Sequence, residues 1–144
     1  MSQGEVIVAV IDDDPSVRRS LSRLLRSQGF GVETYASARG FLERGNYARL
    51  ACLVLDIRMP GQNGLELQEV LAVAGHDIPI IFMTGHGDVQ LAERAREGGA
   101  VDFLAKPFAE ETFFNAVQRA LARNRPTPTR SEQGGRRARG VTGA

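Results

Sequence analysis

Four aspartates stand at the ends of short apolar runs. Asp12, Asp13 and Asp14 follow one run in succession, and Asp56 ends another. Asp14 precedes Pro15, and its presence is explained by helix capping: it is the N-cap of a predicted helix whose first residue is proline. Asp12 and Asp13 have no comparable local reason. Clustered carboxylates raise each other's pKa unless a cation neutralises them, and oxygen ligands without His or Cys favour Mg²⁺ over zinc.

Two further polar residues, Thr84 and Lys106, also follow apolar runs. Taken alone, each is most often a strand, turn or surface residue. Beside a metal held by carboxylates, the lysine can neutralise phosphoryl oxygens and the threonine can donate a hydrogen bond to them. A central carboxylate can then act as the nucleophile and form an acyl phosphate. Asp56 is the best candidate, since the Asp12-Asp13 pair and Lys106 would flank it.

Alternating strands and helices must bring these residues together. Apolar runs predict strands at residues 6–11, 31–35, 52–56, 79–83 and 101–105. Helical spacing predicts helices at residues 15–28, 38–44, 64–74, 88–97 and 110–123. This alternation indicates an α/β fold, a doubly wound five-stranded parallel sheet with right-handed crossovers. In the flavodoxin-like strand order 2-1-3-4-5, the carboxyl ends of the strands form one rim, where such sheets bind ligands.

The composition fits one globular domain and a basic tail. Of the 144 residues, 42% are hydrophobic and 24% are charged, which is enough for a core. Residues 1–123 hold 13 basic and 16 acidic side chains, a net charge of −3. Residues 124–144 hold five arginines and one glutamate, a net charge of +4, with several prolines and glycines. That tail has too little apolar surface to fold, and we expect it to be disordered.

Other features exclude some classes of protein. The single cysteine, Cys52, lies among apolar residues and is expected to be a buried hydrophobic side chain. No apolar stretch approaches the ~20 residues that span a bilayer, and no segment resembles a signal peptide. We therefore expect a cytoplasmic protein without a membrane partner. An acidic body with a basic tail is not typical of a DNA-binding domain, so direct DNA binding is not expected.

Four segments resemble the receiver domain of bacterial response regulators, which act in two-component signalling. The segments are VIDDDPSVR, LVLDIRMPGQNGLEL, IIFMTGHGD and GAVDFLAKPF. The resemblance covers about residues 5–123, and its last two segments look most like the FixJ-type branch. It implies a phosphorelay protein that accepts a phosphoryl group from a histidine kinase or a histidine phosphotransfer protein on Asp56.

The resemblance also implies roles for residues around the acceptor. Asp13 and Asp56 would ligate Mg²⁺ together with the backbone carbonyl of Arg58, and Asp12 would act through water. Lys106 would bind the phosphoryl group. Its bond to the following proline, Pro107, would be a cis peptide bond.

Two more pairs of residues would control the signal. Thr84 and Phe103 would form a switch that reports phosphorylation to the surface of the fourth helix, fifth strand and fifth helix. Arg58 and His86 occupy positions that tune dephosphorylation in the family, although His86 could equally be an exposed loop residue.

FixJ-type regulators usually continue into a DNA-binding domain, for which the last 20 or so residues here are too few. The expectation is therefore a single-domain receiver that serves as a relay, as a switch that binds a downstream protein target, or as a phosphate sink that competes for the kinase. A second copy of the chain is another expected partner, in a dimer that depends on phosphorylation. The predicted fourth helix is charged, so the two copies would pair there through complementary charges. The protein would not be an enzyme, and would catalyse only its own phosphotransfer and autodephosphorylation.

Three other functions compete with this one. The closest is a receiver fold that serves as a protein-binding module independent of phosphorylation, although such modules usually lose an acid, the threonine or the lysine. A flavin- or nucleotide-binding protein would need a phosphate-binding loop where the three aspartates stand. A phosphatase with an aspartate nucleophile usually has a second acid two residues later, where this chain has Arg58.

Overall fold

The part of the chain that the structure describes forms five strands and five helices in strict alternation, as predicted. The computed structural model describes residues 6–59, 61, 63–85 and 89–124. The strands are β1 (Ile7–Ile11), β2 (Gly31–Tyr35), β3 (Leu50–Asp56), β4 (Ile80–Thr84) and β5 (Asp102–Ala105). The helices are α1 (Pro15–Ser27), α2 (Ala38–Arg44), α3 (Gly64–Val73), α4 (Val89–Glu97) and α5 (Glu110–Asn124). Except for its first residue, the predicted basic tail lies outside the described residues.

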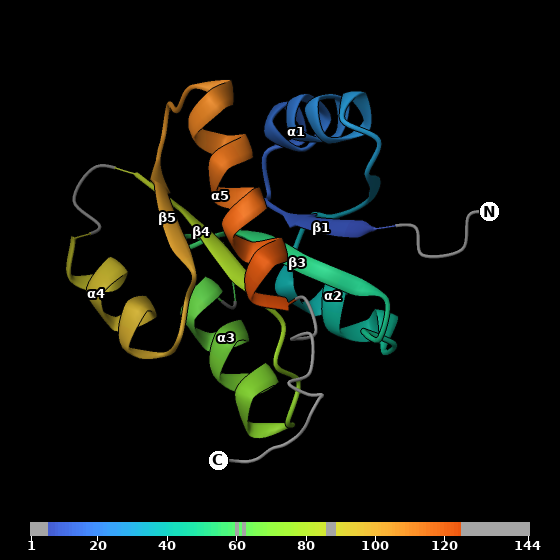
Figure 1. Ribbon diagram of the computed structural model, residues 1–144. Helices are drawn as coiled ribbons and strands as arrows, with labels where there is room; N and C mark the ends of the chain where they lie inside the picture. Colours follow the sequence, from blue (N-terminus) through green and yellow to red (C-terminus); the bar gives the residue numbers. More distant parts are fainter. Residues whose placement is uncertain (1–5, 60, 62, 86–88, 125–144) are drawn as a thin grey trace, which may run out of the picture.

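All five strands are parallel, and their order is β2-β1-β3-β4-β5 (Figure 1). The predicted strand order is therefore confirmed. β1 and β3 lie inside the sheet and are covered on both faces, which explains their nearly continuous apolar sequences. β3 begins two residues earlier than predicted, because Leu50 already pairs with Ile7 of β1.

Helices cover both faces of the sheet. Because side chains alternate along a strand, neighbouring residues of β3 enter different cores. Leu55 packs in the cluster that holds Leu67 of α3, and α2 and α4 contribute to the same face. Val54 and Cys52 pack in the cluster that holds Phe113 of α5, together with residues of α1. The predicted burial of Cys52 is confirmed.

The helices that follow the two acidic strand ends both begin with a side-chain cap. Asp14 caps α1 by accepting a hydrogen bond from the backbone N–H of Ser16 at 2.8 Å. Asn63 and Glu66 form a capping box at the start of α3. These caps fix the chain on either side of the strand ends, where the predicted site residues lie. Within the described residues, no helix is long and apolar enough to cross a membrane.

Candidate functional site

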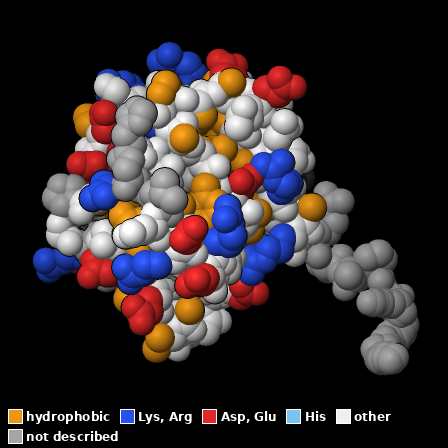
Figure 2. Space-filling view, turned by 90° about the vertical axis from the view of Figure 1, so that its left-hand side faces the viewer, with side chains coloured by type: hydrophobic (Ala, Val, Ile, Leu, Met, Phe, Trp, Pro, Cys, Tyr) orange, Lys and Arg blue, Asp and Glu red, His pale blue; other side chains and the backbone are white. Residues whose placement is uncertain are grey.

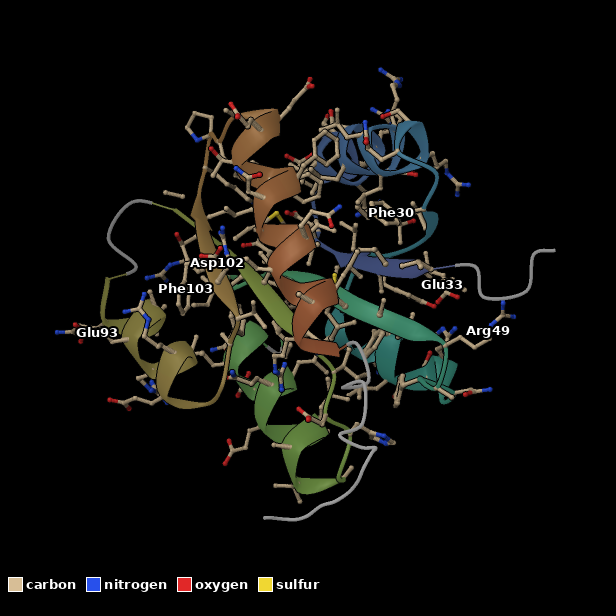
Figure 3. All side chains as sticks on the ribbon, viewed as in Figure 1. Phe30, Glu33, Arg49, Glu93, Asp102 and Phe103 are labelled. Atoms are coloured by element: carbon tan, nitrogen blue, oxygen red, sulfur yellow. The ribbon has the colours of Figure 1, made fainter. Side chains whose placement is uncertain are left out.

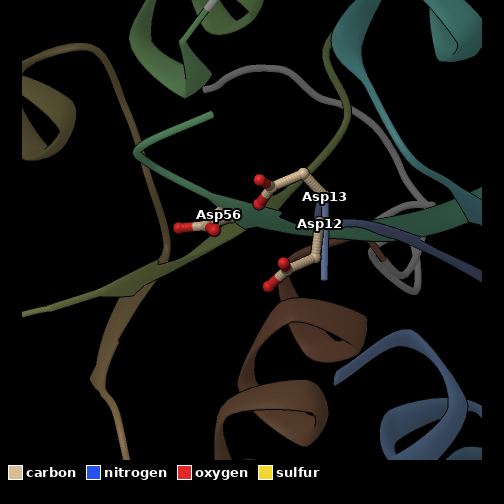
Figure 4. A group of neighbouring side chains, drawn as sticks. All are labelled: Asp12, Asp13 and Asp56. Carbon is tan, nitrogen blue, oxygen red and sulfur yellow. The ribbon is translucent and has the colours of Figure 1, made fainter. Parts of the chain in front are cut away.

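Three carboxylates meet at the carboxyl ends of the adjacent strands β1 and β3. Asp12 and Asp13 directly follow β1, and Asp56 is the last residue of β3. One oxygen from each carboxylate lies within 4.8 Å of the others (Figure 4). Asp12 is fully buried and Asp56 is 8% exposed, whereas Asp13 is open to solvent. The pairing of β1 with β3 brings Asp56 to the Asp12-Asp13 pair, from which it is far apart in the sequence.

Lys106 bridges two of the acids. Its Nζ lies 3.0 Å from Oδ2 of Asp12 and 3.3 Å from Oδ2 of Asp56. The lysine directly follows β5, and its backbone N–H donates a 2.8 Å hydrogen bond to the carbonyl of Thr84. The peptide bond from Lys106 to Pro107 is cis. The Lys106 ammonium is thus shared between Asp12 and Asp56.

Burial and charge shift the protonation of the central pair. Burial raises the pKa of Asp56, and the neighbouring charge of Asp12 raises it further, while Lys106 acts in the opposite direction. Burial lowers the pKa of Lys106, but its hydrogen bond to Asp12 and the charge of Asp56 more than offset this, so that the pKa is raised. Lys106 therefore remains a cation at neutral pH.

The backbone around Asp56 depends on a glycine that the sequence analysis did not single out. The N–H of Arg58 donates to Oδ1 of Asp56 at 3.3 Å, and the N–H of Gly64 donates to the carbonyl of Ile57 at 3.0 Å. A Cβ on Gly64 would lie 2.7 Å from the carbonyl oxygen of Asp56 and 2.9 Å from Cε1 of Phe82. The first turn of α3 therefore packs so closely on Asp56 that only glycine fits.

Thr84 and Phe103 lie on the neighbouring strands β4 and β5. Thr84 is buried, and its hydroxyl lies 3.5 Å from the carbonyl oxygen of Leu104, a long hydrogen bond. The half-buried ring of Phe103 lies on the side of β5 that faces α4 (Figure 3). It is nearly parallel to the ring of Phe82, with 6.3 Å between their centroids. His86 lies outside the described residues.

Asp12 is held in place by contacts that the sequence motifs did not predict. The Arg18 guanidinium donates a 2.7 Å hydrogen bond to the carbonyl of Asp12, and the N–H of Asp14 donates to Oδ1 of Asp12 at 2.9 Å. Arg18 ends the segment VIDDDPSVR, but the sequence analysis assigned it no role. The first contact fixes the backbone of Asp12, and the second fixes its carboxylate, whose other oxygen bonds to Lys106.

The donor set suits a hard divalent cation. Among the described residues, this group of potential metal ligands consists of carboxylates alone, with no His or Cys. Oxygen ligands of this kind are typical of Mg²⁺, and a partly exposed site allows the ion to retain water. The acids, the lysine and the buried hydroxyl together form a site suited to phosphoryl transfer onto a carboxylate.

Comparison with known proteins agrees with this geometry. The family model of the response regulator receiver domain matches residues 8–118. Over 121 residues, the chain is 46% identical to the response regulator protein TodT of Pseudomonas putida, covering 84% of this chain and 53% of TodT. It is 47% identical to the transcriptional regulatory protein FixJ of Azorhizobium caulinodans over 133 residues, 90% of this chain and 63% of FixJ.

Solved structures lead to the same family. The response regulator StyR superposes with a TM-score of 0.78 at 48% identity, covering 83% of this chain and 61% of that one. The crystal structure of FixJ-N superposes with a TM-score of 0.74 at 39% identity, covering 85% of this chain and 96% of that one.

Proposed function

The chain belongs to the response regulator receiver domain family, and from this membership we propose that it accepts a phosphoryl group on Asp56. The donor is a histidine kinase or a histidine phosphotransfer protein. The observation that carries the proposal is the Lys106 ammonium, which contacts both Asp12 and Asp56 beside the cluster of three carboxylates. Receiver domains are signalling phospho-acceptors that work with histidine kinases, which agrees with this assignment.

In the proposed reaction, a carboxylate oxygen of Asp56 attacks the phosphorus of a phosphohistidine. The new P–O bond forms while the P–N bond breaks, and the imidazole leaves with the electron pair and takes a proton from solvent. Lys106, 3.3 Å from Oδ2 of Asp56, neutralises charge on the phosphoryl oxygens. Thr84 donates a hydrogen bond to one of them once its hydroxyl leaves the carbonyl of Leu104.

Asp13, Asp56 and the backbone carbonyl of Arg58 would hold Mg²⁺, with Asp12 acting through water. The bound ion supplies positive charge next to the phosphoryl oxygens. Hydrolysis of the acyl phosphate later restores the Asp56 carboxylate. We assign the tuning of this step to Arg58, whose side chain is exposed, and to His86.

The proposed output is a change in the surface formed by α4, β5 and α5, driven by Thr84 and Phe103 and recognised by a partner protein. The chain spans 53% of the length of TodT and 63% of the length of FixJ, which is named a transcriptional regulatory protein. The single-domain organisation and the absence of direct DNA binding therefore stay predictions.

The proposal is tested by incubating the protein with acetyl phosphate and Mg²⁺ and following its intact mass. We expect wild type to gain one phosphoryl group only when Mg²⁺ is present. The Asp56→Asn variant gains none, and Asp13→Asn needs a higher Mg²⁺ concentration. Acetyl phosphate serves as the donor because its transfer does not depend on the identity of the kinase.

The alternative function is a protein-binding module that works without phosphorylation. It predicts no adduct at any donor concentration and no change in thermal unfolding when Mg²⁺ is added. An adduct on the Asp56→Asn variant would also contradict the proposal, because it would place the acceptor elsewhere.

A further inference from the structure

Phe103, the aromatic residue of the proposed switch, also contacts a cation. The guanidinium Cζ of Arg96, on α4, lies 4.7 Å from the centroid of the Phe103 ring. This is within the range of a cation–π interaction, in which the positive charge is attracted to the face of the ring. Arg96 is itself exposed, so it covers the ring without being fixed by burial.

Packing contacts also connect the Phe103 ring to Asp56, the proposed phospho-acceptor. Its ring is stacked on the fully buried ring of Phe82, which in turn lies against Gly64 beside the backbone of Asp56. Leu104, the next residue of β5, accepts the hydrogen bond of the Thr84 hydroxyl. Arg96 is therefore the exposed end of a series of contacts that reaches the backbone of Asp56.

Of the charged residues near Phe103, Arg96 is the cation whose guanidinium lies over the ring. The preceding residue, Asp102, forms an ion pair with Arg119 of α5. Glu93 lies on α4 one turn before Arg96 (Figure 3). Basic, acidic and hydrophobic side chains are interspersed on the side of the molecule where α4 and β5 lie, without one large apolar patch (Figure 2).

We propose that Arg96 is a positioning residue that holds Phe103 in the conformation in which Thr84 is bonded to β5, and so opposes the switch. The inference rests on the proposed function. To donate to a phosphoryl group, the Thr84 hydroxyl must leave the carbonyl of Leu104, which frees the strand segment that carries Phe103. Any change that releases the Phe103 ring then favours the phosphorylated conformation, and by linkage strengthens binding of a phosphoryl mimic at Asp56.

The test uses beryllofluoride with Mg²⁺ as the mimic, and 4-fluorophenylalanine at the phenylalanine positions as the probe. The Phe103 resonance is assigned by its absence in Phe103→Leu. We expect Arg96→Gln to bind beryllofluoride about two- to five-fold more tightly than wild type, the effect of losing one exposed cation–π contact. The Phe103 fluorine resonance of the free variant should also move towards the position it takes in the bound wild type.

Three further variants separate this role from a simple change of charge. Arg94→Gln removes the same charge from an exposed position on α4 and should change neither the affinity nor the resonance. Arg96→Lys keeps a cation and should lie closer to wild type than Arg96→Gln does. In a Phe103→Leu background, Arg96→Gln should have no further effect, because the ring that it covers is gone.

Equal effects of Arg94→Gln and Arg96→Gln would overturn the proposal, as would an undiminished effect of Arg96→Gln in Phe103→Leu. If wild type fails to bind beryllofluoride, the proposed phosphotransfer function fails. In that case an unchanged Phe103 resonance in Arg96→Gln would separately show that Arg96 does not position the ring.

Discussion

Asp56 is the proposed phospho-acceptor, and the fold makes its charged form costly. The fold places its carboxylate in an almost buried site next to a second acid, Asp12, and both effects raise its pKa. Lys106 compensates for part of this by bonding to both carboxylates. A buried charge of this kind contributes little to stability, even with a cationic partner.

We therefore predict that Asp56→Asn is more stable than wild type at neutral pH without Mg²⁺, by about 1 kcal/mol. The pKa of Asp56 is raised in the folded state, so the wild-type protein is most stable when Asp56 is protonated. This contribution to the free energy of unfolding is lost as the pH rises through the folded-state pKa. The advantage of the variant should be small below the ordinary pKa and complete at neutral pH. Urea unfolding in EDTA across this pH range measures it.

An advantage of Asp56→Asn that is as large in acid as at neutral pH would contradict this account. Lys106 retains its contact with Asp12 in the variant, so the substitution does not leave the ammonium without a partner. Added Mg²⁺ should stabilise wild type more than the variant, because the variant lacks one of the proposed ligands.

At the scale of the elements, α3 determines where the chain beyond β3 can lie. Gly64, the first residue of α3, packs directly on the backbone of Asp56 and Ile57. The sequence placed Gly64 at the start of a helix but gave no reason for glycine there. The reason is steric and appears only when β3 and α3 are in contact.

We predict that Gly64→Ala destabilises the protein by about 2 kcal/mol and slows phosphorylation by acetyl phosphate. The added Cβ would lie 2.7 Å from the carbonyl oxygen of Asp56 and 3.1 Å from Cα of Ile57, so backbone must move. The control is Gly40→Ala in α2, whose Cβ would meet only side-chain atoms, the nearest being Oγ of Ser37 at 3.3 Å. Thermal unfolding and the rate of phosphoryl uptake measure both effects.

For Gly40→Ala we expect a change within about 1 kcal/mol and unchanged phosphorylation, since alanine favours helices over glycine. If Gly64→Ala matched this control in stability and in the rate of phosphoryl uptake, the close packing of α3 on Asp56 would affect neither property.

At the scale of the whole molecule, both faces of the sheet are closed by helices. Cys52, in the middle of β3, is fully buried, and burial raises the pKa of its thiol to about 12. Reagents that need the thiolate can reach it only when the α1 and α5 layer leaves the sheet. Its reactivity therefore reports the opening of the entire fold.

We predict that alkylation of Cys52 in the native protein is slower than in the unfolded chain by about a thousand-fold or more. The logarithm of the alkylation rate should increase with urea concentration with the same slope as the logarithm of the equilibrium constant for global unfolding. Val73→Cys serves as the control, since Val73 is 84% exposed on α3 and a thiol there should react at once. Fast labelling of Cys52 that does not depend on urea would reveal a local opening of the sheet instead.

The sequence by itself determined the elements and their order. Apolar runs set the strands, helical spacing set the helices, and Asp14 with Pro15 marked the start of α1, because these patterns depend on neighbouring residues. It also named the acids, the hydroxyl and the lysine, since their chemistry is visible at the strand ends. The parallel sheet then follows from the alternation of elements.

Only the tertiary structure decided which groups touch. The bridge from Lys106 to both Asp12 and Asp56 joins segments that are 94 and 50 residues apart. The glycine requirement at residue 64 and the Arg96–Phe103 contact likewise depend on how helices pack against strands. Such contacts arise from the close packing of distant segments, which a pattern along the chain does not record.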